Sequence, residues 1–367
     1  MKITVIGGGP AGLYFALLMQ RRFPDYRITV LEQNPRDATY GWGVVFSTIA
    51  FLKDIDPAFF KSADYIEFVH RGETVKLDGN PFYRVARIDL LNALQQRCSA
   101  AGVRIEFGGK VTDYELLLKE NDLVVAADGA YSATRTHYAQ AFGTTLDVRP
   151  NKFVWYATTR LFDPVTLIFQ QTPHGVFVGH AYRYTEDKSS FVAECSPDTW
   201  RRAGLDRMSE EESCRHCERV FADYLDGEAL LTNRSLWFSC VIVRDARWSH
   251  GNLVLLGDAA RTGHPSIGAG TRLAMGDSLH LFESFVRNGS DIAPALADYE
   301  RVRRPRSTEL QEAAVRSAAW YETVESRMHL EPVLLAYDFL MRTGRVKHDD
   351  LRSRDPEFLE RYLTAVS

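Results

Sequence analysis

The chain has 367 residues, of which 45% are hydrophobic and 25% charged, a balance that excludes a disordered, collagen-like or coiled-coil protein. Its 44 Lys and Arg against 48 Asp and Glu leave a net charge of −4, which gives no reason to expect nucleic acid or an acidic membrane surface as a partner. No apolar run reaches the roughly 18 residues that cross a bilayer, and five scattered cysteines indicate reduced thiols. We therefore expect a cytoplasmic protein with no membrane partner.

The first stretch carries a dinucleotide-binding pattern. The apolar run from Lys2 to Ile6 predicts a buried strand, and the glycine-rich segment GGGPAG follows it. Apolar residues at helical spacing come next, and the segment from Arg27 to Glu32 predicts a second strand. In such a unit the glycines let a pyrophosphate approach the backbone, and the helix start faces it with free N–H groups. The acid at the end of the second strand accepts from a ribose hydroxyl and disfavours a 2′-phosphate. The pattern predicts FAD or NAD, and not NADP, bound by Gly7, Gly9, Pro10, Ala11, Gly12 and Glu32.

Two later segments favour FAD. DLVVAADGAYSATR predicts a strand that runs into Asp128, and NLVLLGDAARTGHPSIGAGTRLAMGDS predicts a strand that ends at Asp258, then a loop and a helix. With GGGPAG, these segments resemble the three fingerprints of the aromatic-ring flavin monooxygenases built like p-hydroxybenzoate hydroxylase. The resemblance implies bound FAD. Because a second dinucleotide fingerprint is not visible, it also implies NADH or NADPH as a reductant that docks transiently.

The resemblance assigns roles to single residues. Asp258 would bind the FAD ribose, and Arg87, in VARIDLLNAL, would lie near the pyrophosphate. Arg261 departs from the histidine that many relatives carry, and we attach no functional cost to it. The loop against the flavin ring would contain Pro265, Gly268, Ala269 and Gly270.

The fold that follows is α/β, with a Rossmann-like FAD-binding domain, an inserted antiparallel-sheet substrate domain and C-terminal helices. We assign 1–60, 80–150 and 245–290 to the first, 61–79 and 151–243 to the second, and 291–367 to the last. Apolar and polar residues alternate with a period of two in four segments, which predicts the antiparallel strands: FVWYATTRLF, VTLIFQQT, GVFVGHAYRYT and SSFVAECS. Helices are predicted over 290–330 and 333–361, the former kinked or restarted at Pro305.

The resemblance implies hydroxylation of an electron-rich aromatic ring by O₂, through a C4a-hydroperoxyflavin. His264, beside Pro265, is a candidate catalytic base, and a loop histidine bonded to backbone accounts for it equally well. His180 and Tyr182 share one face of a predicted strand and are candidate substrate contacts, although a satisfied core histidine is the favoured interpretation of His180. In TYGWGVVFS, a predicted loop and helix start, Trp42 and Phe46 are candidate ring contacts, and core packing explains Trp42 equally.

Two further patterns favour ordinary structure. Cys214 and Cys217 form one CxxC in a polar helical stretch, and without a second pair we expect no metal. The run RVRRPR (301–306) is typical of a solvated helix face. Together with Arg201 and Arg202, it is also the densest basic cluster available to bind substrate phosphates.

The subfamily resemblance points to the substrate. Four segments resemble the violacein-pathway flavin hydroxylase: GWGVVFS, NKFVWYATT, GHAYRY and WYETVESRMHL. The 266–278 loop and the tail from residue 334 look more like salicylyl-CoA 5-hydroxylase and the flavin domain of 2-aminobenzoyl-CoA monooxygenase. We expect an aryl-CoA thioester such as salicylyl-CoA, hydroxylated at C5, and no ring-reducing chemistry. An indole-derived intermediate is the alternative substrate, and a catalytically silent flavin-binding protein is the alternative class. The Trp-x-Trp-x-x-Pro segment of a flavin halogenase is not found. The oligomeric state stays open.

Overall fold

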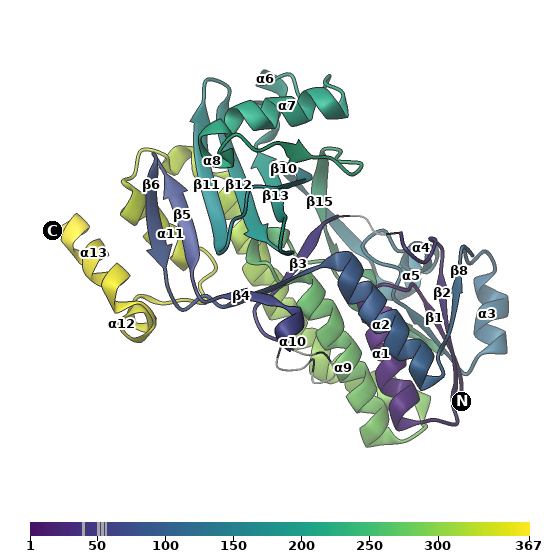
Figure 1. Ribbon diagram of the computed structural model, residues 1–367. Coiled ribbons are helices and arrows are strands. Elements are labelled where there is room, and N and C mark those ends of the chain that lie inside the picture. The colour runs from purple at the N-terminus through teal and green to yellow at the C-terminus, as the bar shows by residue number, and fades with distance from the viewer. Residues whose placement is uncertain (39–40, 50–51, 53–54, 56) are drawn as a thin grey trace.

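The first sheet of the protein is the predicted nucleotide-binding sheet (Figure 1). The computed structural model describes residues 1–38, 41–49, 52, 55 and 57–367. The strand order is β16 (Ser249–His250), β17 (Leu253–Leu255), β9 (Leu123–Ala126), β1 (Lys2–Ile6), β2 (Arg27–Glu32) and β8 (Arg104–Phe107). All neighbours are parallel except β16 and β17. Because β1 lies between β9 and β2, the segments that follow these three strands meet at one edge.

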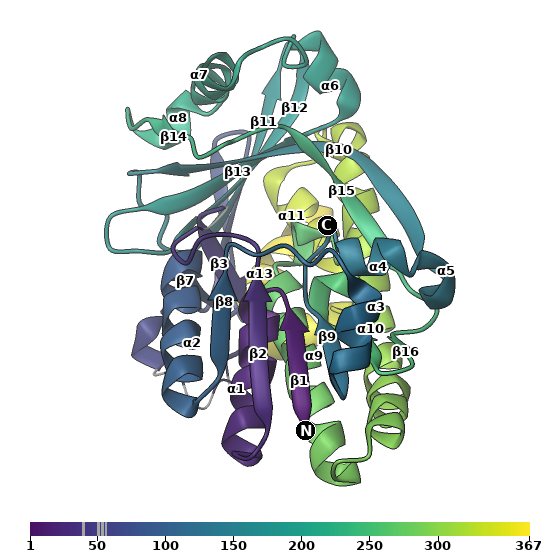
Figure 2. The same ribbon diagram turned by 90° about the vertical axis from the view of Figure 1, so that its right-hand side faces the viewer.

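Helices cover both faces of this sheet. On one face α1 (Pro10–Arg22) packs between α2 (Arg87–Ala101) and α9 (Gly270–Asn288), and α10 (Ile292–Glu322) lies along α9 (Figure 1). The other face carries α3 (Tyr114–Glu120), α4 (Ala133–His137) and α5 (Ala139–Phe142) (Figure 2). No helix in the described part of the chain is both long and apolar enough to span a membrane.

The second sheet lies across the carboxyl ends of the first sheet's strands (Figure 2). Its order is β14 (Leu230–Leu231), β10 (Thr145–Thr158), β13 (Ser189–Cys195), β12 (Gly175–Arg183), β11 (Val165–Thr172), β5 (Ile66–His70) and β6 (Glu73–Leu77), and β15 (Phe238–Arg244) also pairs with β10. The predicted antiparallel pairing is confirmed for the strands of 151–243, whereas β11 and β5 run parallel.

The two faces of the second sheet pack against different elements. The outer face carries α6 (Pro197–Arg202), α7 (Glu210–Val220) and α8 (Ala222–Leu225) over a core that includes Tyr156, Phe177 and Phe191. The inner face packs against the end of α10 and against α11 (Pro332–Met341), through Trp320 and Phe339. The polar residues discussed below lie on the inner face.

A small third sheet corrects one expectation. It consists of β3 (Gly43–Phe46), β7 (Phe82–Ala86) and β4 (Lys61–Ala63), so GVVF is a strand rather than the predicted loop and helix start. Its antiparallel partner β7 comes from distant sequence, and short-range patterns do not reveal such pairing. Thr39 and Tyr40 of the same stretch lie outside the described residues.

The C-terminal helices differ from the prediction in two places. α10 runs unbroken through Pro305, because tertiary contacts on both sides hold it: Arg303 bonds Asp277, and Gln311 Nε2 donates to the carbonyl oxygens of Val243 and Thr262. The segment 333–361 is not one helix but α11, α12 (Leu351–Arg354) and α13 (Pro356–Val366). Asp355 caps α13 by accepting from the Phe358 N–H at 3.1 Å, and Pro356 follows at the first helical position, which favours a new helix there.

A buried ion cluster joins α9, α10 and the loop after β17. Asp277 on α9 is 0% exposed and accepts from Arg261 Nη2 at 2.9 Å and from Arg303 Nε at 2.6 Å. The expectation that RVRRPR is a solvated, phosphate-binding face is therefore wrong for Arg303. Arg301 already pairs with Asp298, at 2.5 Å.

Loss of the shared carboxylate should destabilise the protein strongly. Asp277→Ala leaves two buried guanidinium groups unpaired, and we expect it to lower the free energy of unfolding by about 3–5 kcal/mol, measured by urea denaturation. Arg301→Ala is the matched control, because it breaks a pair whose arginine is exposed and should cost less than about 1 kcal/mol. An Asp277→Ala protein as stable as the control would contradict this assignment.

Candidate active site

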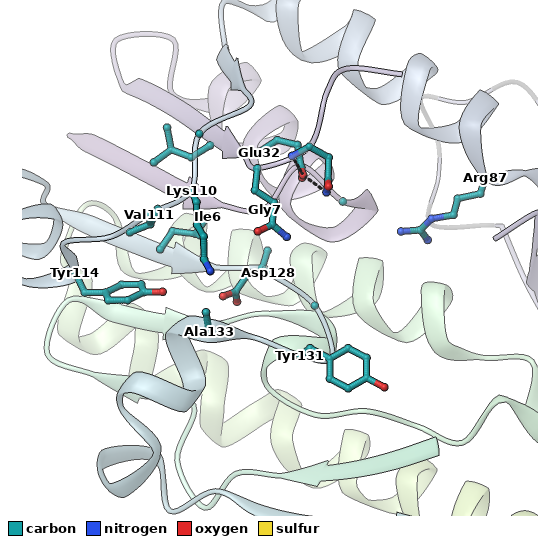
Figure 3. A pocket seen from close by; sticks show the side chains of 17 residues that line it. Ile6, Gly7, Glu32, Arg87, Lys110, Val111, Tyr114, Asp128, Tyr131 and Ala133 are labelled. Carbon is teal, nitrogen blue, oxygen red and sulfur yellow. Dashed lines mark hydrogen bonds between the residues drawn. The ribbon is translucent and has the colours of Figure 1, made fainter. Parts of the chain in front are cut away.

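A cavity of about 300 Å³ opens at the carboxyl edge of the first sheet, where β1, β2 and β9 end (Figure 3). Its wall includes Gly7, Gly9, Glu32, Arg87 and Asp128, all of them predicted cofactor residues. The sheet topology thus brings together residues that are up to 121 positions apart, from Gly7 to Asp128.

The glycine turn forms the floor of this cavity. Gly7 has φ +105°, and a Cβ there would lie 2.3 Å from the Ala127 carbonyl oxygen. A Cβ on Gly12 would lie 2.2 Å from the Gly7 oxygen, so α1 sits directly on the turn. Gly9 differs, since a Cβ there would meet nothing within 4 Å. The space beside Gly9, at the start of α1 with Pro10 and Ala11, is therefore open for a phosphate group.

Two carboxylates are fixed at the cavity wall. Glu32 Oε2 accepts from the Gly8 N–H at 2.7 Å, and its Oε1 accepts from the N–H and the side-chain amide of Asn34 at 2.8 and 2.7 Å. Each carboxylate oxygen has two lone pairs, so these bonds orient Glu32 and leave acceptor capacity for ribose hydroxyls. Asp128 Oδ2 accepts from Thr134, whereas its Oδ1 is buried with no partner among the described residues.

Arg87 supplies the positive charge. Its guanidinium points into the cavity (Figure 3) and makes no hydrogen bond or ion pair with any residue that the structure describes. Burial lowers the pKa of Arg87, and the carboxylates of Asp258 and Glu32 oppose that shift. Burial raises the pKa of Asp258, against the effect of Arg261 and Arg87. The guanidinium of Arg87, which has no partner among the described residues, and the open backbone at Gly9 fit the diphosphate of a dinucleotide. The unpartnered Asp128 Oδ1 can accept from a hydrogen-bond donor of the same ligand.

The loop that precedes α9 positions His264. The residue is 2% exposed, its Nδ1 accepts from the Ser266 N–H at 3.3 Å, and its ring meets Phe153 of β10 edge-on at 5.3 Å. Burial lowers the pKa of His264 to about 4, so the ring is neutral at pH 7. With Nδ1 accepting, the proton resides on Nε2, which is buried and has no partner in the described part of the chain. The arrangement favours a hydrogen-bond donor rather than the predicted base.

The rest of the loop brings α9 close to the third sheet. Pro265 begins a 3₁₀ turn that ends at Gly268, where φ is +57°. A Cβ on Gly268 would lie 3.1 Å from Val45 of β3, so the loop lies against that strand. Ala269 and Gly270 then start α9, whose positive dipole end suits an anionic ring system.

His180 and Tyr182 share the inner face of the second sheet, as their alternation in β12 predicts. His180 Nε2 lies 2.9 Å from Glu194 Oε2 of β13, and Tyr182 donates its hydroxyl to the Gly43 carbonyl at 2.8 Å. Burial raises the pKa of Tyr182 to about 12. Tyr182 thus anchors the Gly43 segment to the sheet, and its role as a substrate contact stays a prediction.

The two predicted ring contacts near β3 lie in different surroundings. Phe46 is fully buried in the core of the first domain and packs edge-on against Phe60 at 5.7 Å, so packing accounts for it. Trp42 has a buried Nε1 without a partner among the described residues, and its carbonyl accepts from the Arg87 N–H at 2.9 Å. Trp42 remains a candidate contact.

Sequence reasoning missed three polar residues on this face. Glu194 is 1% exposed and accepts from Asn151 Nδ2 at 2.7 Å. Tyr321 of α10 lies with its ring 5.3 Å from that of His180. A lone acid within the apolar strand SSFVAEC was the available signal for Glu194, but only the strand register shows which residues surround it.

The cysteines belong to the interior. All five are free and buried, and Cys214 and Cys217 point from α7 into the core under the outer helices. Among the described residues, no group of three or more His, Cys, Asp or Glu side chains is placed to hold a metal ion.

The fold and the cavity define a flavoprotein of the aromatic hydroxylase class. Residues 88–314 match the FAD binding domain family, and residues 5–38 match the NAD(P)-binding Rossmann-like domain. The chain belongs to the FAD-dependent aromatic-ring monooxygenases, which confirms the resemblance found in the sequence. It binds FAD and takes reducing equivalents from NAD(P)H.

Three relatives match nearly the whole chain. Salicyloyl-CoA 5-hydroxylase of Streptomyces sp is 38% identical over 98% of this chain and 73% of its own length. Protodeoxyviolaceinate monooxygenase of Chromobacterium violaceum is 34% identical, over 92% of this chain and 94% of its own length. 3-Hydroxy-4-methyl-anthranilyl-[aryl-carrier protein] 5-monooxygenase of Streptosporangium sibiricum is also 34% identical, over 96% of this chain and 97% of its own length. The fold matches that of p-nitrophenol 4-monooxygenase from Pseudomonas putida, with a TM-score of 0.74 at 18% identity over 99% and 97% of the two chains.

The glycine turn gives a direct test of FAD binding. Gly9→Val should fold, because the Gly9 backbone is extended and a Cβ there meets no atom within 4 Å. It should purify without FAD, because the side chain enters the space that the phosphate would occupy. Gly12→Val is the contrasting variant and should fail to fold, because its Cβ collides with the turn. Flavin absorbance and circular dichroism separate the two effects. A Gly9→Val protein that stays yellow with one FAD per chain would overturn the placement of the pyrophosphate.

Proposed function

We propose that this hydroxylase acts on an aromatic ring presented as a thioester, with 2-hydroxybenzoyl-CoA (salicylyl-CoA) hydroxylated at C5 as the substrate that fits best. The observation that carries the proposal is the buried Glu194 carboxylate on the substrate-facing side of the second sheet. The 38% identical relative is named for a CoA thioester, and a 34% identical relative is named for a ring held on a carrier protein, which supports the same substrate class.

Glu194 disfavours a free aromatic acid beside it. The hydrogen-bond partners of its carboxylate are the amide of Asn151 and the ring of His180, neither of which carries a fixed positive charge. Arg149, whose charge acts on neighbouring His264, is already paired with Glu322 at 2.5 Å and with Asp147 at 3.2 Å. A substrate carboxylate placed near Glu194 would meet a like charge in a poorly solvated site, whereas a thioester carbonyl is neutral.

The residues of this chain would hold, orient and shield the two reactants. FAD would be held by Gly9, Glu32, Arg87 and Asp258. When bound, it supplies the chemistry that activates O₂ with electrons from NAD(P)H. Phe153 and Tyr321 would cover the acyl ring and exclude water. The Nε2–H of His264 would donate to a ring substituent or to the thioester carbonyl.

The phosphates of CoA would lie outside the apolar site. Arg303 is not available to them, and Arg304 donates to the Ala246 carbonyl. Arg201 and Arg202 are 62% and 51% exposed and remain candidates, although Arg201 also pairs with Asp198. We place the enzyme in the cytoplasm, where its five free cysteines would stay reduced.

The thioester should matter for turnover as well as for affinity. Binding of the remote nucleotide positions the ring, and the neutral carbonyl avoids Glu194, so we expect kcat/KM for salicylyl-CoA to exceed that for free salicylate by about 100-fold or more. Product masses and substrate-dependent NAD(P)H oxidation measure both reactions. Equal kcat/KM for acid and thioester would contradict the proposal and favour an indole-derived substrate.

A further inference from the structure

Three residues that bond Glu194 or feel the charge of its carboxylate each have a buried polar atom without a partner in the described part of the chain. These atoms are Asn151 Oδ1, His264 Nε2 and the Tyr321 hydroxyl. Asn151 bonds Glu194 directly, the Tyr321 ring touches His180, and Glu194 and His180 both act on the charge of His264. A buried polar atom without a partner costs about 1–3 kcal/mol, so three in one place indicate that a polar ligand completes this cluster.

The Glu194–His180 contact fixes the tautomer of His180. The carboxylate accepts from Asn151 Nδ2 through Oε1 and lies 2.9 Å from His180 Nε2 through Oε2. An ionised carboxylate only accepts hydrogen bonds, so Nε2 carries the proton. The other ring nitrogen, Nδ1, is then a lone-pair acceptor, and it has no hydrogen-bond partner among residues 1–38, 41–49, 52, 55 and 57–367.

We propose that His180 is the base that removes the proton from the ring hydroxyl of the substrate, with Glu194 as its positioning residue. This inference rests on the proposed function. The O–H bond of the phenol breaks, an N–H bond forms at His180 Nδ1, and the electron pair stays on the oxygen. The ring that results is richer in electrons at the carbons ortho and para to that oxygen, and C5 of a 2-hydroxybenzoyl group is para to it.

Titratable groups from several elements lie near His180 and Glu194. Glu194 Oε2 of β13 lies 2.9 Å from His180 Nε2, and the ring of Tyr321 of α10 lies 5.3 Å from the His180 ring. The charge of Glu194 also acts on His264 of the loop before α9 and on Cys240 of β15. Arg342, which follows the end of α11, lies beside Tyr321, and Arg149 of β10 is paired with Glu322. A histidine held between a buried carboxylate and its substrate is the arrangement that serves general-base catalysis in hydrolases.

Two variants of the holoenzyme test the base. His180→Gln removes it, and Glu194→Gln keeps the shape but removes the carboxylate charge that would balance the protonated ring. We expect hydroxylation of salicylyl-CoA to fall by about 100-fold or more in each. His70→Gln is the matched control, because His70 is a buried histidine on the same sheet that bonds the Leu330 carbonyl, and it should hydroxylate normally.

A second substrate separates a base from a merely structural residue. The ring amine of 2-aminobenzoyl-CoA donates electrons without losing a proton, so both variants should lose far less activity on it than on salicylyl-CoA. Both variants should also regain activity on salicylyl-CoA at alkaline pH, where the phenol ionises in solution. Without NAD(P)H, the phenolate absorption of salicylyl-CoA bound to the oxidised enzyme should appear in the wild type and be absent in the variants at neutral pH.

The outcomes distinguish this inference from the proposed function. Variants that hydroxylate salicylyl-CoA at the wild-type rate, or that lose both thioesters equally, would overturn the base assignment alone. A wild-type enzyme that hydroxylates neither thioester would overturn the proposed function and this inference with it.

Discussion

The buried carboxylate of Asp277 connects the parts of the molecule that make the active site. It lies on α9, and its two partners, Arg261 and Arg303, come from the loop after β17 and from α10. That loop holds Asp258, whose charge acts on Arg87 at the cofactor cavity, and His264, whose ring meets Phe153 of the second sheet. α10 carries Tyr321 to the same sheet. Two buried guanidinium groups on one carboxylate are tolerated only while all three charges stay paired. The cofactor cradle and the substrate face are therefore held together by one electrostatic constraint.

The two halves of the site use charge in opposite ways. At the cofactor cavity, the Arg87 guanidinium, which has no partner in the part of the chain that the structure describes, and the N–H groups at the start of α1 offer positive charge to a diphosphate. On the second sheet, the partners of the buried Glu194 carboxylate, Asn151 and His180, carry no fixed positive charge, so this carboxylate would repel a carboxylate on the substrate. The cofactor cavity thus suits a charged ligand, and under the proposed function the second sheet would receive a neutral aromatic acyl group.

Local sequence patterns predicted the cofactor half well. The strand at 2–6, the glycine turn, the helix and the strand at 27–32 depend on near neighbours and on the sterics of single glycines, and the structure has each of them. The edge position of Asp128 and Glu32 follows from parallel strand order, which the βαβ pattern predicts. The alternation in β12 also placed His180 and Tyr182 on one face correctly.

The substrate half depended on long-range pairing that no local pattern encodes. Glu194 and Asn151 reach His180 only through the register of three strands, and Tyr321 arrives from a helix more than a hundred residues later. Tertiary contacts likewise override the break expected at Pro305, and pairing with β7 makes a strand of GVVF. Arg303 was misjudged because a basic run on a helix says nothing about the buried acid on a neighbouring helix.

The central claim is that this chain is a flavoprotein that transfers oxygen to an aromatic acyl thioester. The most direct measurement is the origin of the new ring oxygen when salicylyl-CoA is incubated with the FAD-loaded enzyme, NAD(P)H and isotopically labelled O₂. The account predicts that each hydroxylated thioester carries one labelled oxygen on the ring, formed with consumption of one NAD(P)H. Unlabelled product, or oxidation of NAD(P)H that yields only hydrogen peroxide and leaves the thioester unchanged, would contradict it.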